Sequence, residues 1–584
     1  MFRTARCRVL THFCLVSLIG WPLGCSDDTT GRTAQNVQAE LYGFDRVIEV
    51  EVELAAADWD KLRFESPGLD HYLLPTCLDG PRPRAFTYQP AMVTIDGKRF
   101  EDAEVRKKGF KGTMTPQKPS LKVRLHTDDS IDGVRRLTLN NSAQDGNFVT
   151  TCLAYGLFAA AGLPAPRCGY AHVRVNGVDM GVYVHVESIR KPMIERTFGH
   201  FEGHLYENTM ADFQAGTLQI FERKNKEEIE PRPELLGIQQ ALDGPDDKLF
   251  EALGAWVDLD AFFTYWAMEV LTGHWDGYTG NRNNNYAFFD SKSGKLSFIP
   301  WGADATFSGP WNFWGPFLNE SASLPRAVYA HGRISKRLYA TKEGRKRYFA
   351  RLGQLLDSVW DETTILAQID VMKARIGPLW TEKGAARAGK RIETVRTWIK
   401  AHRAALEPAV QGAEPEFTLT AGPLPLCGEV TLTVSGSFST TWNTLNDSPL
   451  DHGKGELVAH IVGADGAVED KSLSLVRGVA GPIASAVDEG AVHILMGFGT
   501  LAGGKVYALD ILVPAELFVA GRTLKLNYGD ASAEAGTVNL GTLKTTAVGF
   551  VLAGELTFTK VGTQDGDEVA FTINAPIARL HVTD

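Results

Sequence analysis

The sequence predicts an α+β unit followed by a second region that is all β. Within residues 43–410, alternating apolar runs such as RVIEVEVEL come first, and apolar residues later recur every three or four positions, over 231–270 and 334–410. A sheet-rich half followed by a helix-rich half is typical of one α+β unit. Residues 415–584 consist of short β-type runs separated by Gly, Asp and Asn. This spacing favours a β-sandwich region of one or two modules.

Strands come first along the α+β unit. Alternation marks a strand over 46–54, and Asp-Gly and Asn-Gly turns at 96–97 and 176–177 each separate two strand-like runs. One helix interrupts this sheet, because the run NFVTTCLAYGLFAAAG has an apolar face and stops at Gly162. We therefore expect hairpins and one helix in the first half of the unit.

The N-terminus has the pattern of an export signal. Three arginines precede a short apolar run that ends at Gly24-Cys25, and the polar stretch 26–42 that follows is typical of a linker. A small residue before a cysteine resembles a bacterial lipoprotein cleavage site. We predict a signal peptide over 1–25 and a lipid anchor on Cys25, in the cell envelope; a plain secretory signal is the alternative.

Charge and cysteine content restrict the class of protein further. The chain has 60 basic and 70 acidic residues, a net charge of −10, which argues against a general binder of nucleic acid or anionic membranes. Four cysteines remain after the predicted signal, and none of them has the spacing of a zinc site. In an oxidising compartment an even number allows two disulfides, whose pairing the sequence leaves open. These cysteines are Cys77, Cys152, Cys168 and Cys427.

The segment 261–310 carries the clearest chemical signal. Asp276 lies on a Trp-Asp-Gly turn after an apolar run, Asn285 enters a short aromatic strand, and Asp304 follows a second apolar run. A Mg-nucleotide phosphotransferase uses one acid to orient the acceptor hydroxyl, and an amide and a second acid to hold the metal. Base and Asn are five residues apart in ordinary protein kinases, and Asp276 and Asn285 are nine apart, so the loop must bulge. Nearby amides are alternatives to Asn285: Asn281, Asn283 and Asn284.

Two basic segments upstream have the character of phosphate-binding elements. The Gly-rich run KKGFKGT, with Gly109 and Gly112, could lay backbone N–H groups over phosphates. In the next strand, KPSLKVRL, alternation places Lys118, Lys122 and Arg124 on one side. We choose Lys122 as the lysine that pairs with α- and β-phosphates; Lys118 and Arg124 are rivals, and a solvated basic face is the plain alternative. The Gly-rich run adds three further lysines: Lys107, Lys108 and Lys111.

Six ordered blocks over roughly 46–400 resemble the CotH kinase family, which consists of atypical secreted or surface kinases. The blocks are VRKKGFKG, KPSLKVRL, LTLNNSAQDGNFVTTCLAYGLF, GLPAPRCGYAHVRVNGVDMGVYVHVE, HWDGYTGNRNNNYAFF and FIPWGADATF. The resemblance implies a sheet-rich N-lobe, a helix-rich C-lobe and a role for Glu187 near the nucleotide. Two departures stand out: Gly302 replaces the first acid of the family's W-D-x-D, and Thr150-Thr151 replace an Arg-Glu or Arg-Asp pair.

The sequence thus predicts an exported ATP-dependent kinase that acts on Ser or Thr of a surface or secreted protein. Mg²⁺, or Mn²⁺ in its place, would be held by Asn285 and Asp304, with Asp276 as the base and Lys122 on the phosphates. A degenerate kinase-like scaffold, whose β-rich region binds carbohydrate or a coat protein, is the main alternative. Nucleotidyl transfer in the same site is a third. No G-x-S-x-G, H-E-x-x-H or P-loop motif supports a hydrolase, zincin or Walker-type reading.

Overall fold

The computed structural model of this protein describes two lobes and a β-rich region. Several predicted features lie outside the described residues: the signal peptide with Cys25, all but the last two residues of the linker, Cys77 and Gly112. The described residues are 41–65, 80–81, 86–109, 115–126, 130–131, 133–225, 232–309, 325–415, 426–444, 453–462, 467–484, 489–499, 505–526, 532–539, 544–551 and 554–582.

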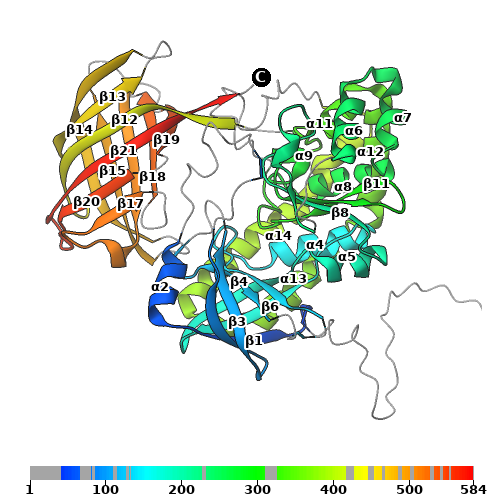
Figure 1. Cartoon of the computed structure of the whole chain (residues 1–584), viewed down its shortest axis with the longest axis horizontal. Coiled ribbons are helices and arrows are strands. Elements are labelled where there is room, and N and C mark those ends of the chain that lie inside the picture. The colour runs from blue at the N-terminus through cyan, green and yellow to red at the C-terminus, as the bar shows by residue number, and fades with distance from the viewer. Residues whose placement is uncertain are drawn as a thin grey trace, which may run out of the picture.

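The first lobe is a closed β-barrel, in which the parallel pair β1–β6 completes an otherwise antiparallel ring (Figure 1). Alternate residues of its strands point inward and form an apolar core, as the period-two pattern of the sequence predicted. The two predicted hairpin turns are confirmed: Asp96-Gly97 and Asn176-Gly177 have positive φ at both residues, which Asn, Asp and Gly tolerate. The strands are β1 (Val47–Glu53), β2 (Gln89–Ile95), β3 (Lys98–Lys108), β4 (Ser120–Arg124), β5 (Arg136–Asn140), β6 (Cys168–Val175) and β7 (Val178–Glu187).

The second lobe packs helices around a small four-stranded sheet of order β11-β10-β8-β9. At its centre lies α8 (Leu259–Leu271), in which every residue from Phe262 to Leu271 is buried. This complete burial explains why AFFTYWAMEVL is apolar on all sides of the helix. The strands are β8 (Gly203–Asn208), β9 (Glu222–Arg223), β10 (Asn285–Asp290) and β11 (Lys295–Pro300).

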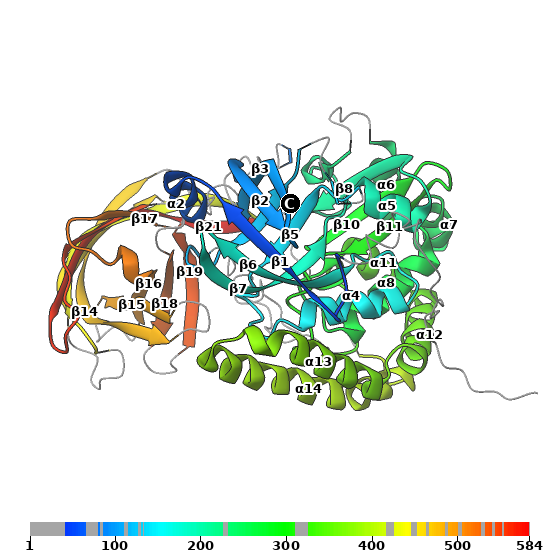
Figure 2. The same cartoon turned by 90° about the horizontal axis from the view of Figure 1, so that it is seen from below.

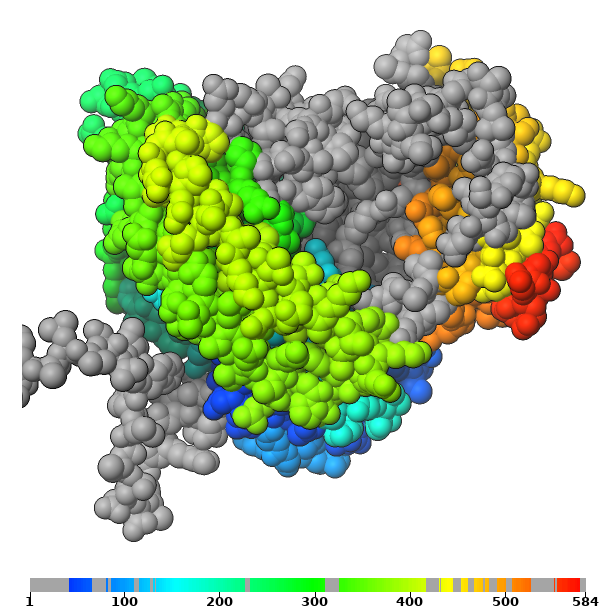
Figure 3. Space-filling model, turned by 180° about the vertical axis from the view of Figure 1, so that it is seen from behind, coloured from blue at the N-terminus to red at the C-terminus, as the bar shows by residue number. Residues whose placement is uncertain are grey.

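Helices α4, α13 and α14 complete the α+β unit. The predicted helix at NFVTTCLAYGLFAAAG is α4 (Thr150–Ala160), which packs against the barrel strands β6 and β7. Figure 2 shows α13 (Glu362–Ile376) and α14 (Glu382–Val410) side by side along one edge of the two lobes. In Figure 3, which views the molecule from behind, their yellow-green surface covers much of the α+β unit. The remaining helices are α2 (Ala56–Phe64), α5 (Lys191–Phe198), α6 (Pro233–Asp243), α7 (Leu249–Gly254), α9 (Tyr278–Asn281), α11 (Arg333–Ala340) and α12 (Lys342–Ser358).

The C-terminal region is β-rich, as predicted, and its strands form one sheet that curls around its own core. The first strand, β12, pairs both with β13 and with the last strand, β21. Strand spacing predicted short β-type runs but could not indicate this pairing between distant segments. The strands are β12 (Leu426–Thr441), β13 (Lys454–Val462), β14 (Val468–Ala484), β15 (Glu489–Phe498), β16 (Lys505–Val513), β17 (Thr523–Leu526), β18 (Ser532–Asn539), β19 (Lys544–Val551), β20 (Gly554–Lys560) and β21 (Glu568–Val582).

Helix α2 connects the barrel to the β-rich region. Phe64 packs against the core of that region, and Arg63 Nη1 lies 2.9 Å from Glu516 Oε1. On its other side, the carbonyl of Arg63 accepts a hydrogen bond from the fully buried Lys107 of β3, at 2.6 Å.

Among the described residues, none of the helices has the length and apolar character needed to cross a membrane.

Candidate functional site

A buried glutamate fixes the backbone of the loop between α8 and β10, which carries the predicted base. Glu269 of α8 is fully buried, and its carboxylate accepts hydrogen bonds from the backbone N–H of Tyr278 at 2.8 Å and of Thr279 at 2.7 Å. Burial raises the pKa of Glu269 to about 7. A Cβ at Gly277 would lie 2.0 Å from Glu269 Oε1, so only glycine fits here. The loop is therefore held tightly just after Asp276.

Asp276 accepts hydrogen bonds from three asparagine amides of this loop. Asn281 donates to Oδ1 at 2.5 Å, Asn283 to the same oxygen at 3.3 Å, and Asn284 to Oδ2 at 2.6 Å. Burial raises the pKa of Asp276 to about 6; the amide bonds act to lower it, and the charge of Asp304 acts to raise it. The carboxylate is thus oriented by neutral donors and titrates near neutral pH, which suits a group that accepts a proton from a hydroxyl.

Asp304 lies in the turn after β11 and interacts electrostatically with both lobes. Burial raises its pKa, and the charge of Lys108 in the first lobe lowers it. The charge of Asp304 in turn raises the pKa of Asp276 and that of Asp145, just before α4. The structure therefore brings the two predicted acids into one region and adds Asp145, which the sequence analysis did not single out.

Two asparagines have amide oxygens suited to a metal. Asn285 is fully buried; its Nδ2 donates to the carbonyl of Asn283 at 3.0 Å, and its Oδ1 accepts no hydrogen bond from the described residues. Asn281 lies five residues after Asp276, the spacing of base and metal ligand in protein kinases, and its Nδ2 is already used by Asp276. The five-residue spacing was the signal by which the sequence could have ranked Asn281 above Asn285.

The departure at Gly302 has a steric cause. Gly302 has φ of +53°, and a Cβ there would lie 2.6 Å from both Cγ and Oδ1 of Asn284. The side chain of Asn284, which also donates to Asp276, therefore takes the space beside Gly302. An acid at this position would collide with the amide that orients Asp276.

The departure at Thr150 also has a visible role. Its hydroxyl donates to Asp145 Oδ2 at 2.6 Å, where the resemblance implies a charged pair. Thr151, next to it, is buried as well. A neutral hydrogen bond therefore replaces charge at the N-terminal end of α4.

Lys108 and Lys122 extend from the outer face of the barrel. Burial lowers the pKa of Lys108 to about 8, and its ammonium donates to Asn140 Oδ1 and lies 5.9 Å from the centre of the Trp301 ring. Burial also lowers the pKa of Lys122 well below its usual range, and the charge of Glu207 in β8 opposes this. Both lysines share one strand face, but Lys108 is the one on which the charge of Asp304 acts.

The other predicted basic residues lie elsewhere or have partners of their own. Lys118 precedes β4, and its ammonium donates to the carbonyl of Val182 at 2.8 Å. Arg124 forms an ion pair with Glu104 and stacks 4.2 Å from the centre of the Tyr88 ring. Gly109 directly follows β3, next to Lys108.

Glu187 points away from the lysine face. In the barrel, Lys122, Thr138 and Val186 are register partners and share one face, so the next residue, Glu187, points to the other. Its carboxylate forms ion pairs with Arg167 at 2.7 Å and Arg196 at 2.6 Å. These arginines account for its lowered pKa against the opposing effect of burial. The structure therefore gives Glu187 a place in an ion-pair cluster with these two arginines.

The described residues contain no group of three His, Cys, Asp or Glu side chains arranged around a metal. The oxygens present nevertheless fit a hard cation such as Mg²⁺, which takes carboxylate and amide oxygens together with phosphates and water. One buried acceptor, Asn285 Oδ1, has no hydrogen-bond partner among the described residues. Orphaned buried oxygens of this kind are the groups that a cation would satisfy.

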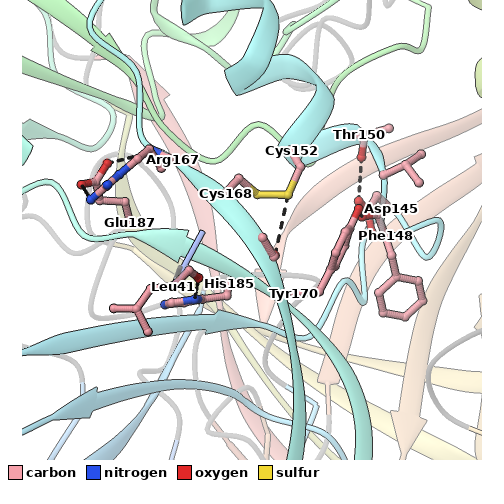
Figure 4. Close-up of a disulfide and its surroundings, with 12 residues drawn as sticks. Leu41, Asp145, Phe148, Thr150, Cys152, Arg167, Cys168, Tyr170, His185 and Glu187 are labelled. Atoms are coloured by element: carbon pink, nitrogen blue, oxygen red, sulfur yellow. Dashed lines mark hydrogen bonds and ion pairs between the residues drawn. A yellow bond between two sulfur atoms is a disulfide. The ribbon is translucent and has the colours of Figure 1, made fainter. Parts of the chain in front are cut away.

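A disulfide joins α4 to the barrel close to these residues (Figure 4). Cys152 and Cys168 are bonded, with Cα atoms 5.1 Å apart. The sequence left the pairing open; Cys77 and the side chain of Cys427 lie outside the described part of the chain. The bridge places Cys152 two residues after Thr150, in the first turn of the helix.

A barrel lobe that carries a half-buried lysine and a helical lobe that carries two acids form the arrangement of a kinase-like protein. The chain belongs to the family described as CotH kinase protein, which it matches over residues 105–405. It is similar to the inner spore coat protein H of Bacillus subtilis (strain 168), 23% identical over 309 residues, which are 50% of this chain and 80% of that protein.

Two further comparisons are weaker. The inner spore coat protein H-like protein of the same organism is 23% identical over 282 residues, 48% of this chain and 84% of that protein. The crystal structure of the Helicobacter pylori proinflammatory kinase CtkA covers 50% of this chain and 95% of its own, with 13% identity and a TM-score of 0.27.

Proposed function

We propose that this protein transfers the γ-phosphate of Mg-ATP to a Ser or Thr hydroxyl of a surface or secreted protein. The observation that supports the proposal is that the charge of Asp304 acts on both Asp276 and Lys108, which come from different elements of the two lobes. Membership of a kinase family supports the same reaction class.

Asp276 accepts the proton of the acceptor hydroxyl as its oxygen bonds to the γ-phosphorus and ADP leaves. The three asparagine amides hold this carboxylate in one orientation, so that its free electron pairs face the hydroxyl. Lys108, with Lys122 beside it, neutralises phosphate charge. Mg²⁺, or Mn²⁺, would be held by Asp304 with Asn281 or Asn285 and would offset the charge on the phosphate oxygens.

An exported location fits this proposal. The N-terminal pattern predicts export and a lipid anchor at Cys25, and the disulfide Cys152–Cys168 is of a kind that persists in oxidising compartments. The relatives are named as spore coat proteins. We propose that the acceptor is a protein of the same cell surface.

Label transfer from γ-labelled ATP by the full chain, to itself and to a Ser-rich test protein, tests the reaction. Asp276→Asn should lower the rate by a factor of about 10² to 10⁴, the usual contribution of a general base. Asp304→Asn should lower it comparably, whereas Asp260→Asn, which removes an exposed acid on α8, should not. Equal labelling by Asp304→Asn and the native chain would remove Asp304 from the mechanism.

The absence of the family's first acid, at Gly302, favours one other function, a kinase-like scaffold without activity. Mg-ATP discriminates the two, because a ligand that binds only the folded protein stabilises it by RT ln(1 + L/Kd), where L is the free ligand concentration. A scaffold would show neither a melting-temperature shift with Mg-ATP nor label transfer. Mass spectrometry of the product distinguishes an added phosphoryl group from an added nucleotide.

A further inference from the structure

Three arginines on the outer face of the barrel form a cluster that is short of acids. Arg106 of β3, Arg124 of β4 and Arg136 of β5 point outward, because a chain neighbour of each lies in the barrel core. Glu104 forms an ion pair with Arg124. Within the described residues, no carboxylate lies within ion-pair distance of Arg106 or Arg136. The cluster therefore keeps a local positive charge in a chain whose net charge is −10.

The strand register of the barrel sets like charges opposite one another in this cluster. Arg124 and Arg136 are register partners in β4 and β5, and Arg106 is the partner of Lys122 in β3 and β4. Burial lowers the pKa of Arg136, and the charges of nearby arginines lower it further. Like charges directly opposite each other destabilise a sheet. A bound anion would replace this repulsion with attraction.

Tyr88, the residue before β2, holds the three arginines around its ring. The guanidinium groups of Arg124 and Arg106 lie 4.2 and 5.3 Å from the ring centre. Arg136 Nη1 donates to the hydroxyl of Tyr88 at 3.4 Å. A guanidinium group that stacks on an aromatic ring uses its face, which leaves N–H groups at its edge for an anion. The arginines are thus arranged before a ligand binds, which lowers the entropic cost of binding.

A phosphate monoester has the chemistry that this cluster recognises. It carries nearly two negative charges and three acceptor oxygens, which match the N–H donors of several guanidinium groups. The cluster also lies next to Lys122, because Arg124 follows it by two residues on the same strand face, a distance of about 7 Å. An anion bound here would therefore lie beside the lysines of the proposed phosphate site.

We propose that Arg106, Arg124 and Arg136 bind a phosphorylated Ser or Thr of the acceptor protein, and so keep the acceptor at the site after a first transfer. This inference rests on the proposed function, since that reaction produces the ligand. It adds a site for the product, separate from the site for ATP.

Binding of a labelled Ser-rich peptide with one phosphoserine, measured by fluorescence anisotropy on the full chain without nucleotide, tests the proposal. The native chain should bind this peptide at least about tenfold more tightly than the same peptide without phosphate. Arg124→Gln and Arg136→Gln should each weaken binding by about fivefold or more. Arg174→Gln is the matched control, because it removes an arginine from the outer face of β6 that pairs with Glu49, and it should bind like the native chain.

Glu104→Gln is a second variant whose expected effect has the opposite sign. It removes the carboxylate that pairs with Arg124, so the phosphopeptide should bind about threefold more tightly or better. A variant that fails to fold would lose binding, so a gain in affinity reports on the arginines themselves. Weaker or unchanged binding by Glu104→Gln would count against the proposal.

The outcomes separate the inference from the proposed function. Native-like binding by both arginine variants, in a chain that transfers label from ATP, would overturn the inference and leave the proposed function standing. Phosphopeptide binding that depends on the arginines, in a chain that transfers no label, would overturn the proposed function and retain the phosphopeptide site. Displacement of the peptide by inorganic phosphate as effectively as by unlabelled phosphopeptide would assign the cluster to free phosphate. Displacement by Mg-ATP would assign it to the nucleotide site, and either displacement overturns the inference.

Discussion

The two lobes present opposite charges to the site, and both are held in an unfavourable environment. On the barrel, burial lowers the pKa of Lys108 and Lys122. On the helical lobe, burial raises the pKa of Asp276 and Asp304. A nucleotide with its metal carries both signs, so it would relieve both lobes at once.

The lobes also differ in how they position their charged groups. The barrel presents its lysines from regular strands whose register fixes them, whereas the helical lobe presents Asp276 from an irregular loop. That loop depends on buried polar contacts instead, chiefly those of Glu269. The helical lobe should therefore be the more sensitive of the two to single substitutions.

The largest effect is expected from Glu269→Ala. This change leaves the buried N–H groups of Tyr278 and Thr279 without an acceptor, at a cost of about 1–3 kcal/mol each. The melting temperature should fall and label transfer should be lost, since Asp276 loses its position. Glu251→Ala, an exposed acid on α7, is the control and should melt like the native chain. An unchanged melting temperature for Glu269→Ala would show that the loop does not depend on this anchor.

Substitution of Lys108 and Lys122 tests how much the barrel lobe contributes to ATP binding. Lys108→Met should raise the KM for ATP about tenfold or more, because a phosphate contact is worth at least 1.4 kcal/mol. Lys122→Met should raise it less, since the charge of Asp304 acts on Lys108 and is not among the charges that act on Lys122. Steady-state kinetics on both variants measures this order. The reverse order would make Lys122, the choice made from sequence, the main phosphate contact.

The pH dependence of the reaction should have an acidic limb from Asp276 in the helical lobe and an alkaline limb from Lys108 in the barrel. Asp276, with a pKa of about 6, must be ionised to accept a proton, so kcat/KM should fall as pH decreases through 6. Lys108, with a pKa of about 8, loses its charge above that pH, so affinity for ATP should decline there. Rates measured from pH 5 to 9 test both limbs. In Lys108→Met the alkaline limb should disappear while the acidic limb remains.

The smallest effect is expected at the contact between α2 and the β-rich region. Glu516→Ala removes a partly exposed ion pair with Arg63 and should cost about 0–1 kcal/mol in denaturant unfolding. Phe64→Ala should cost more, because Phe64 packs against the core of that region. If Glu516→Ala is the more destabilising of the two, the packing of Phe64 contributes less than we expect.

Local patterns in the sequence predicted much of this fold. Alternation and Asp-Gly or Asn-Gly turns predicted the barrel hairpins, and the apolar run around Phe262 predicted α8, because these signals lie within a few residues. The pairing of β12 with β21 and the disulfide Cys152–Cys168 depend on contacts between distant segments, which periodicity does not contain.

The sequence predicted that Asp276 and Asp304 each follow a regular element, and the structure confirms these positions after α8 and β11. The choice among lysines could not be predicted, because Lys108 and Lys122 lie on one face and only the arrangement of the lobes distinguishes them. Glu187 was expected near the nucleotide from the resemblance alone, and its two arginine partners lie in sequence segments that gave no sign of contact. Asp145 lies in a turn, where an acid usually has only a local role.

The bridge between Cys152 and Cys168 makes the geometry around Asp145 dependent on redox conditions. It closes a short loop, with a sequence separation of 16, and such a crosslink stabilises a fold by about 3 kcal/mol. Reductants of the kind found in cytosol would remove this constraint from the helix that orients Asp145. A chain with reduced thiols would therefore hold the first turn of α4, and with it the contact between Thr150 and Asp145, less firmly than an oxidised chain.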